Sequence, residues 1–262
     1  MLELNKIYNE DCLKIMPQIP DGSISAIIAD LPYGTTRNHW DSIIPLDQLW
    51  AQYERIIKPD GAIVLFSQQP FTSMLVMSNP KMFKYEWIWE KDSGTGHLNS
   101  KFAPMKIHEN ICIFSKSAAS FVKDKSKAMV YNPQYKKGKP YKGKGGLLGK
   151  GNYDNKWQKE VDTFNDGEHY YPTDIIKFNR DKEKFHPTAK PVELCQYLIR
   201  TYTNSGGVIL DNCMGSGSTI VAAIRENRQY IGIEKEEKYF DIANKRIADE
   251  TSQLSLFEQM NL

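Results

Sequence analysis

The sequence has 262 residues, of which 40% are hydrophobic and 25% charged, a composition typical of a globular chain and not of a disordered or collagen-like one. The formal net charge is +2, but residues 116–160 hold twelve lysines against three acidic residues and so carry +9, which leaves −7 for the rest. Such a basic segment attracts polyanions. No apolar run approaches the roughly 18 residues of a bilayer span, and the N-terminus does not resemble a signal peptide, so we expect a cytoplasmic protein without membrane contacts.

The four cysteines are dispersed along the chain and form no C-x-x-C pair. We therefore expect reduced thiols, with neither a disulfide framework nor a metal site.

The first part of the chain alternates strand and helix patterns. The apolar run at residues 25–30 is stopped by Leu31-Pro32-Tyr33-Gly34, as in a buried strand that ends in a loop. Apolar residues at helical spacing predict a helix over residues 46–57, which residues 58–61 stop. Further strands are predicted at residues 62–66, 85–90 and 110–114, which are rich in β-branched or aromatic residues.

Periodicity fades between residues 117 and 180, which predicts an insertion with little regular structure. Regular patterns then return, and they predict a helix at 191–203, a strand at 208–211, a helix at 218–227, a strand at 230–234 and a helix at 236–249. Alternating strands and helices predict a Rossmann-like, doubly wound, mainly parallel α/β sheet with helices on both faces. We expect one domain at residues 1–250, which includes the insertion, and a C-terminal tail at residues 251–262.

A glycine-rich loop between a strand and a helix, at residues 212–219, indicates a cofactor site. Glycines allow a ligand close to the backbone, and the helix N-terminus offers unpaired N–H groups. Glu234 ends the next strand, seventeen residues after Gly217, where a carboxylate suits a ribose diol. Ile220 stands where a dinucleotide fingerprint has its third glycine, which counts against NAD and favours a nucleoside cofactor without phosphates. A tight turn without a ligand is the alternative.

Three motifs resemble those of the DNA amino-methyltransferases that use S-adenosylmethionine. Asp30-Leu31-Pro32-Tyr33 is similar to their D/N/S-P-P-Y/F motif, and residues 186–191 match their H-P-T-x-K-P element. Residues 211–219 are similar to their D-P-F-x-G-S-G-T-T element. The catalytic motif precedes the cofactor motif, with a basic insertion between them, which is the order of the β class of these enzymes. The resemblance covers nearly the whole chain outside residues 117–180 and implies a methyltransferase fold.

The resemblance implies direct methyl transfer to an exocyclic amine of a base flipped out of the DNA duplex. Because the lone pair of this amine is conjugated with the ring, two acceptors that bind its hydrogens favour a pyramidal nitrogen that can attack in line. Asp30 is the implied side-chain acceptor, the carbonyl of Leu31 the second acceptor, and Tyr33 the ring that stacks on the base. Pro32 stiffens the loop, whereas Leu31 replaces a family proline and loses its rigidity.

The resemblance also implies the cofactor-binding residues. It assigns Asp11 and Cys12 to the edge of the cofactor's adenine, and Thr188 and Lys190 to its methionine end. The full set is Asp11, Cys12, Thr188, Lys190, Asp211, Cys213, Gly215, Ser216, Gly217, Ser218 and Glu234. Asp11 is alternatively a helix N-cap. Asn212 and Cys213 replace a proline and a phenylalanine of the family, and the smaller Cys213 predicts weaker cofactor affinity.

Within the family, Asp at the first motif position favours adenine N6 and Ser favours cytosine N4, so Asp30 predicts methylation of adenine. Cytosine-N4 methylation is the nearest alternative, and an RNA or protein amine is a further possible acceptor. A different class of alternative is a catalytically idle adaptor on the same fold that binds DNA or the bacterial sliding clamp. The residues that argue against it, all intact, are Asp30, Pro32, Tyr33, Gly215, Gly217 and Glu234.

The basic insertion, residues 117–180, is the expected target-recognition region. Lysines suit phosphates, and interleaved aromatic and amide side chains such as Asn132 suit bases. The predicted DNA-binding residues are Arg37, Lys136, Lys137, Lys139, Lys142 and Lys144. A solvated loop without a partner is the alternative. Relatives of this class often dimerise, so a homodimer is an expectation.

The tail residues Gln253-Leu254-Ser255-Leu256-Phe257 resemble the Q-L-S/D-L-F peptide with which bacterial replication and repair proteins bind the sliding clamp. Two leucines and a phenylalanine on an unstructured polar terminus suit an apolar groove. The clamp-binding residues would be Gln253, Leu254, Leu256 and Phe257. The alternative is an amphipathic tail that packs on its own domain.

Overall fold

The computed structural model describes residues 2–34, 41–119, 124, 127–147, 160–181 and 189–260, except for the side chains of residues 144–147, 160–163 and 254–260. These residues form two compact units. Unit 1 comprises Met1–Asn132 and Asp174–Leu262, and unit 2 comprises Pro133–Thr173.

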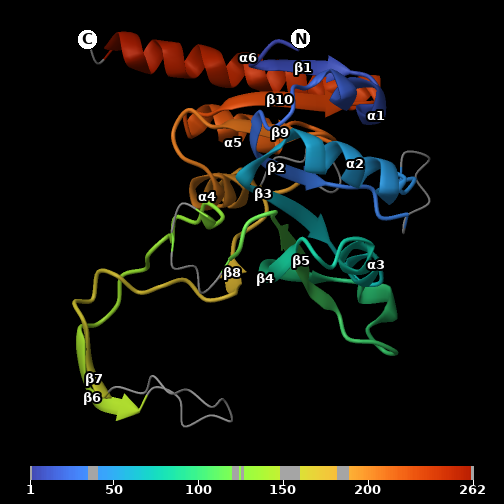
Figure 1. The fold of residues 1–262 in the computed structure, drawn as a ribbon. Coiled ribbons are helices and arrows are strands. Elements are labelled where there is room, and N and C mark those ends of the chain that lie inside the picture. Colours follow the sequence, from blue (N-terminus) through green and yellow to red (C-terminus); the bar gives the residue numbers. More distant parts are fainter. Residues whose placement is uncertain are drawn as a thin grey trace. The chain divides into compact units, whose positions relative to one another are not determined.

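Unit 1 is built around an eight-stranded sheet in the order β1-β10-β9-β2-β3-β5-β4-β8 (Figure 1). β5 runs antiparallel to both of its neighbours, and the other neighbouring strands are parallel. The predicted mainly parallel α/β fold is therefore confirmed. The strands of this sheet are β1 (Lys6–Asn9), β2 (Ile24–Asp30), β3 (Ile57–Ser67), β4 (Phe83–Thr95), β5 (Lys106–Phe114), β8 (Ile175–Lys177), β9 (Val208–Asp211) and β10 (Gln229–Glu234).

Helices cover both faces of the sheet, because the side chains of its strands alternate between two apolar cores. In β2, Ala26 and Ile28 belong to one core, and Ile27 and Ala29 to the other, all of them fully buried. The first core includes α4 (Val192–Tyr202), α5 (Ser218–Arg225) and α6 (Glu237–Met260). The second includes α1 (Cys12–Ile15), the 3₁₀ turn η1 (Met16–Gln18), α2 (Leu46–Ile56) and α3 (Phe71–Ser78). Each buried isoleucine contributes about 1.5–3 kcal/mol to this packing.

The sheet has a switch point between β9 and β2. From β9 the chain passes through α5 to β10 on one side, and from β2 it passes through α2 to β3 on the other. In open parallel sheets, ligands bind outside the carboxyl ends of the strands at such a point. The loops after β2 and β9 therefore lie where a ligand is expected.

The predicted strands and helices are present, with four differences. Residues 58–61 do not separate a helix from a strand but form an irregularity within β3, where a Cβ on Gly61 would lie 2.8 Å from the carbonyl oxygen of Ser25. The short elements β1, α3 and β8 were not predicted, and neither were the two strands of unit 2. These two strands and β8, which pairs with β4, lie within the predicted insertion. α6 continues to Met260, so the expectation of an unstructured tail is wrong. A 3₁₀ turn, η2 (His97–Asn99), lies between β4 and β5.

In unit 2, β6 (Tyr141–Leu147) and β7 (Glu160–Asn165) form an antiparallel pair. The two ends of the unit meet in a bridge between Lys136 and Tyr170. The N–H of Gly138 donates to the carbonyl of Gly167 over 2.7 Å, and the ring of Tyr170 lies where Gly138 would carry a side chain.

Among the described residues, no helix is both long and apolar enough to cross a membrane. The same residues contain no cluster of three or more His, Cys, Asp and Glu side chains that would suit a metal ion. The four cysteines are free thiols.

Candidate active site

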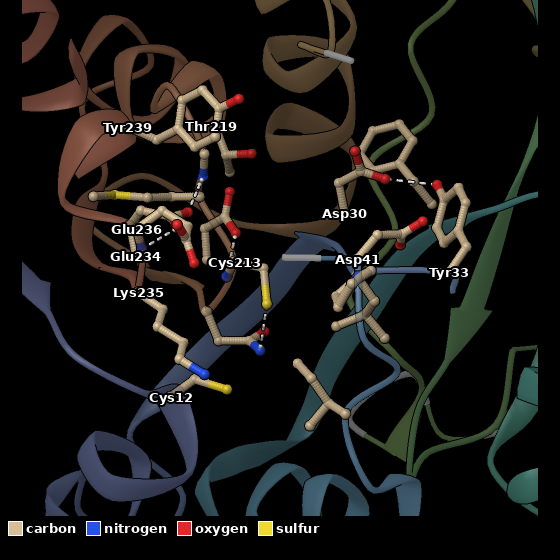
Figure 2. A pocket seen from close by; sticks show the side chains of 18 of the residues that line it. Cys12, Asp30, Tyr33, Asp41, Cys213, Thr219, Glu234, Lys235, Glu236 and Tyr239 are labelled. Carbon is tan, nitrogen blue, oxygen red and sulfur yellow. Dashed lines mark hydrogen bonds between the residues drawn. The ribbon is translucent and has the colours of Figure 1, made fainter. Parts of the chain in front are cut away.

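A cavity of about 620 Å³ lies at the carboxyl ends of β2, β9 and β10. The loop after β2 lines one part of it, and the glycine-rich loop and the end of β10 line another, as Figure 2 shows with Asp30 and Tyr33 on one side and Glu234 and Tyr239 on the other. Asp30, Leu31, Pro32 and Tyr33 all line this cavity. Of the described residues predicted to bind a cofactor, all but Gly217 line it as well.

The carboxylate of Glu234 is held in place at the end of β10. Its Oε2 accepts the backbone N–H of Gly215 over 2.8 Å, and its Oε1 accepts that of Glu236 over 2.8 Å. Burial raises the pKa of Glu234. Because a carboxylate oxygen has two acceptor positions, both oxygens keep capacity for the hydroxyls of a ligand.

Residues of α6 hold the glycine-rich loop in place. Gly217, the N-cap of α5, has φ +79°, and a Cβ there would lie 3.1 Å from the Cβ of Ala243. Arg246 Nη1 donates to the carbonyl oxygen of Ser216 over 2.6 Å. Sequence reasoning missed Ala243 and Arg246, since their helix begins only at Glu237, after another strand, and no local pattern links them to the loop.

Asp211, at the end of β9, is a buried carboxyl whose charge is costly. Its Oδ1 accepts the backbone N–H of Cys213 over 3.1 Å, and Thr219 forms a second hydrogen bond. The pKa of Asp211 is raised to about 7, mainly by burial and in part by the negative charges of Asp30 and Glu234. The carboxyl therefore titrates near neutral pH.

The replaced residues of the loop form a polar wall of the cavity. Tyr53 of α2, which is buried in the second apolar core, donates its hydroxyl to Oδ1 of Asn212 over 2.5 Å. Nδ2 of Asn212 lies 3.4 Å from Sγ of Cys213. A hydrogen bond between the thiols of Cys12 and Cys213 lowers the pKa of Cys12 and raises that of Cys213. The sequence pattern identified Tyr53 only as a core residue of its helix.

Both oxygens of the Asp30 carboxylate are bound within the protein. Oδ1 accepts the hydroxyl of Tyr33 over 2.6 Å, and Oδ2 accepts Nζ of Lys190 over 2.6 Å. The ring of Tyr33 stacks on Phe71 with centroids 5.1 Å apart. Burial raises the pKa of Asp30, although the Lys190 ammonium opposes this shift.

Lys190 and Glu109 make contacts that the sequence did not indicate. Lys190, predicted at the methionine end of a cofactor, contacts Asp30 and also Glu109 Oε2 at 3.2 Å. Glu109 was missed, although an acidic residue beside the apolar run of residues 111–114 was a usable signal.

Asp11 caps α1 by accepting the N–H of Leu13 over 2.9 Å and also lines the cavity, so its two predicted roles are compatible. Asp41, likewise missed, accepts the N–H of Gly34 over 2.8 Å.

The remaining predicted residues lie outside the described residues, in unit 2 or elsewhere in unit 1. Arg37 and Thr188 lie outside the described residues. Lys136, Lys137, Lys139 and Lys142 are exposed residues of unit 2, where Lys137 pairs with Glu168 at 2.7 Å, and the side chain of Lys144 is not described. The amide of Asn132, expected to suit bases, instead donates to the carbonyls of Arg200 and Thr203 at the end of α4.

Comparison with known proteins places the chain in a family. The sequence profile of a DNA methylase family, the N6/N4 methylases, matches residues 24–245. The chain belongs to this DNA methylase family. The type II methyltransferase M1.MboII of Moraxella bovis is 28% identical to this methylase, over 93% of this chain and 96% of the relative.

Two solved structures share the fold. The structure of an M1.HpyAVI–SAM complex has a TM-score of 0.58 and 24% identity, and the alignment covers 92% of this methylase and 98% of that chain. PvuII DNA methyltransferase, which is cytosine-N4-specific, has a TM-score of 0.66 and 14% identity, with 97% and 93% covered. The predicted family and methyltransferase fold are therefore confirmed, and this chain is a DNA amino-methyltransferase of the N6-adenine or N4-cytosine kind.

Proposed function

We propose that this DNA methylase transfers a methyl group from S-adenosylmethionine to the N6 amine of adenine. The observation that carries the proposal is a single cavity with the Asp30 carboxylate on one side and the Glu234 carboxylate and glycine-rich loop on the other. The base to be methylated and the cofactor need to meet within one such space.

The residues around the glycine-rich loop fit the cofactor. Glu234 is aligned by two backbone N–H groups and retains acceptor capacity for a ribose diol. Asp11 and Glu234 also place negative charge around a space that would hold a cation, and Asp211 adds to it when its carboxyl is ionised. When bound, S-adenosylmethionine supplies an electrophilic methyl group. Among the chain's residues, Glu234 and the loop orient the cofactor, and Cys213 packs beside it.

The loop after β2 would hold the amine. Oδ1 of Asp30 has one donor, the Tyr33 hydroxyl, and keeps a second acceptor position for a hydrogen of the amine. The carbonyl of Leu31 would accept the other hydrogen, which makes the nitrogen pyramidal and frees its lone pair. After the transfer, the nitrogen carries one proton too many, and Asp30 is the carboxylate placed to take it. Tyr33, backed by Phe71, offers a ring face for a flipped base.

The preference for adenine rests on Asp30 at the first position of the catalytic motif. Nucleoside mass spectrometry of unmethylated DNA, incubated with S-adenosylmethionine and either the wild type or Asp30→Ala, tests it. We expect N6-methyladenine from the wild type only. N4-methylcytosine would overturn the choice of base and keep the mechanism. No modified DNA base would favour an RNA acceptor or an idle adaptor, and an adaptor would bind DNA equally well after Asp30→Ala.

The exposed lysines of unit 2 are the proposed phosphate contacts of the target-recognition region. Lys136, Lys137, Lys139 and Lys142 lie in or beside the β6 segment, and Tyr171 in the same unit is 71% exposed and available for stacking. Each phosphate contact adds to the salt dependence of DNA binding.

Binding to a bacterial sliding clamp through the tail is a further proposal, and it rests on the sequence of residues 253–257. Their backbone continues α6, so docking in an extended form requires the last turns of that helix to open. A binding assay with purified clamp tests the proposal, with loss of binding expected after changing Leu256 and Phe257 to Ala and unchanged binding refuting it. A homodimer remains a proposal that sedimentation analysis would test.

A further inference from the structure

A row of alternating charges leads from the cavity into the sheet. Tyr33 donates to Asp30, Asp30 accepts from Lys190 over 2.6 Å, and the Lys190 ammonium lies 3.2 Å from Oε2 of Glu109. Oε1 of Glu109 pairs in turn with Lys91. The charged members come from β2, from the residue pair before α4, from β5 and from β4, so only the folded sheet assembles them.

The row is largely buried. The side chains of Lys190, Lys91 and Glu109 are 8%, 12% and 13% exposed, and that of Asp30 is 25% exposed. Buried charges are tolerated where they are paired, and here two ammonium groups balance two carboxylates. Lys190 is further enclosed by the ring of Phe66, whose centroid lies 5.2 Å from Nζ.

The contact between Lys190 and Asp30 poses a chemical problem, because Asp30 must take a proton from the amine. A carboxylate bound only to a buried ammonium is strongly stabilised in its charged form and is therefore a weak base. In this methylase the Lys190 ammonium also pairs with a second carboxylate, that of Glu109, whose negative charge partly offsets the effect of the ammonium on Asp30. The distances of 2.6 and 3.2 Å show that Lys190 is shared between the two.

We propose that Glu109 is a positioning residue for methyl transfer: it shares the Lys190 ammonium with Asp30 and so keeps the Asp30 carboxylate basic enough to take a proton from the target amine. The proposal rests on the proposed function of Asp30. It adds to that function a residue that lines the same cavity and whose proposed role is exerted through Lys190.

The charges facing Asp30 agree with this role. Burial raises the pKa of Asp30, the Lys190 charge lowers it, and the Glu109 charge raises it again. For Lys190 the two carboxylates outweigh burial and raise its pKa, and for Glu109 the two ammonium groups outweigh burial and lower its pKa. Lys190 and Glu109 thus stay charged while Asp30 titrates. Tyr33 stays neutral, because burial raises its pKa. Asp211 is a further titrating group, and the charge of Asp30 raises its pKa.

The test is the titration of the Asp30 carboxyl by carbon NMR in full-length protein with labelled aspartate, its signal assigned by its loss in Asp30→Asn. Since a neighbouring charge shifts a carboxyl pKa by about 1 unit or more, we expect Glu109→Gln to move the titration to lower pH and Lys190→Met to move it to higher pH. The acid limb of kcat for methylation should move in the same two directions. With Glu109→Gln, kcat at neutral pH should fall about threefold, with KM for DNA unchanged, because a weaker base transfers the proton more slowly.

Two variants serve as controls. Glu90→Gln makes the same change at a neighbouring strand, on a glutamate that pairs with Lys177 at 3.0 Å, and should leave the Asp30 titration in place. Glu109→Asp keeps the charge and should keep the titration near that of the wild type. Should Glu109→Gln fail to fold, Lys91→Met is the substitute. Without Lys91, Glu109 interacts more strongly with Lys190 and draws it away from Asp30, so the Asp30 carboxyl should titrate at higher pH.

The opposite directions expected for Glu109→Gln and Lys190→Met separate this role from a merely structural one. An unmoved Asp30 titration in Glu109→Gln, or a shift in the same direction as in Lys190→Met, would overturn the proposal. The NMR titration requires neither DNA nor cofactor. It therefore decides the role of Glu109 even if the protein methylates no base, a result that would refute the proposed function separately.

Discussion

The buried carboxyl of Asp211 should make this methylase less stable as pH rises, and Asp211→Asn should remove that dependence. The folded state raises the pKa of Asp211 from its ordinary 3.8 to about 7. The folded protein therefore binds this proton more tightly than the unfolded chain does, so stability falls as pH rises between the two values and is constant above the higher one. The asparagine is isosteric and can still accept the N–H of Cys213.

The size of the effect follows from the shift of about 3 units, which at about 1.4 kcal/mol per unit corresponds to about 4 kcal/mol. This is an upper value, because a carboxyl in a cavity retains some access to water. The free energy of unfolding of the wild type and of Asp211→Asn should be compared by urea denaturation from about pH 4 to about pH 8. Titrating groups that do not interact with Asp211 contribute equally to both proteins and cancel in the difference.

We expect the variant to gain up to about 4 kcal/mol over the wild type above neutral pH and little near pH 4. Thr219→Val, which removes a hydrogen bond that lowers the pKa of Asp211, should displace the wild-type dependence to higher pH. A difference between wild type and Asp211→Asn that does not change with pH would refute the reasoning.

Three further predictions address the wall of the cavity, the loop and unit 2. Tyr53→Phe leaves the buried Oδ1 of Asn212 without its donor and should cost about 1–3 kcal/mol of unfolding free energy, whereas unchanged stability in urea denaturation would contradict this. Gly217→Ala places a side chain at φ +79° and against Ala243, so we expect a loss of about 1–2 kcal/mol and weaker S-adenosylmethionine binding by calorimetry. Gly206→Ala also has positive φ but nothing within 4 Å, so it should cost stability without a loss of affinity. Changing one of the four lysines proposed to contact phosphate (Lys136, Lys137, Lys139 and Lys142) to Gln should reduce the slope of log affinity against log salt by about 0.9, and an unchanged slope for all four would remove them from the DNA interface.

The sequence by itself determined that the fold is a mainly parallel sheet and where its cavity lies. Buried strands such as residues 25–30 are continuous apolar runs, and a parallel sheet covered on both faces requires such runs, so local composition was sufficient. The catalytic motif and the glycine-rich loop each follow a strand directly. Because the carboxyl ends of adjacent parallel strands lie together, the order of elements was enough to bring both motifs to one cavity.

Only the tertiary structure decided which charges meet. The antiparallel register of β4 and β5 places Lys91 beside Glu109, and Lys190 reaches the same carboxylate from the segment before α4. Such pairing joins residues that are far apart in the sequence. The family resemblance implied a cofactor role for Lys190, and no local pattern shows that its buried ammonium has carboxylate partners on other strands. The same holds for Tyr53 beneath Asn212 and for Asn132 at the end of α4, whose hydrogen bonds join residues 159 and 68 positions apart. Local patterns fix elements, whereas the partners of buried polar groups follow from how the elements pack.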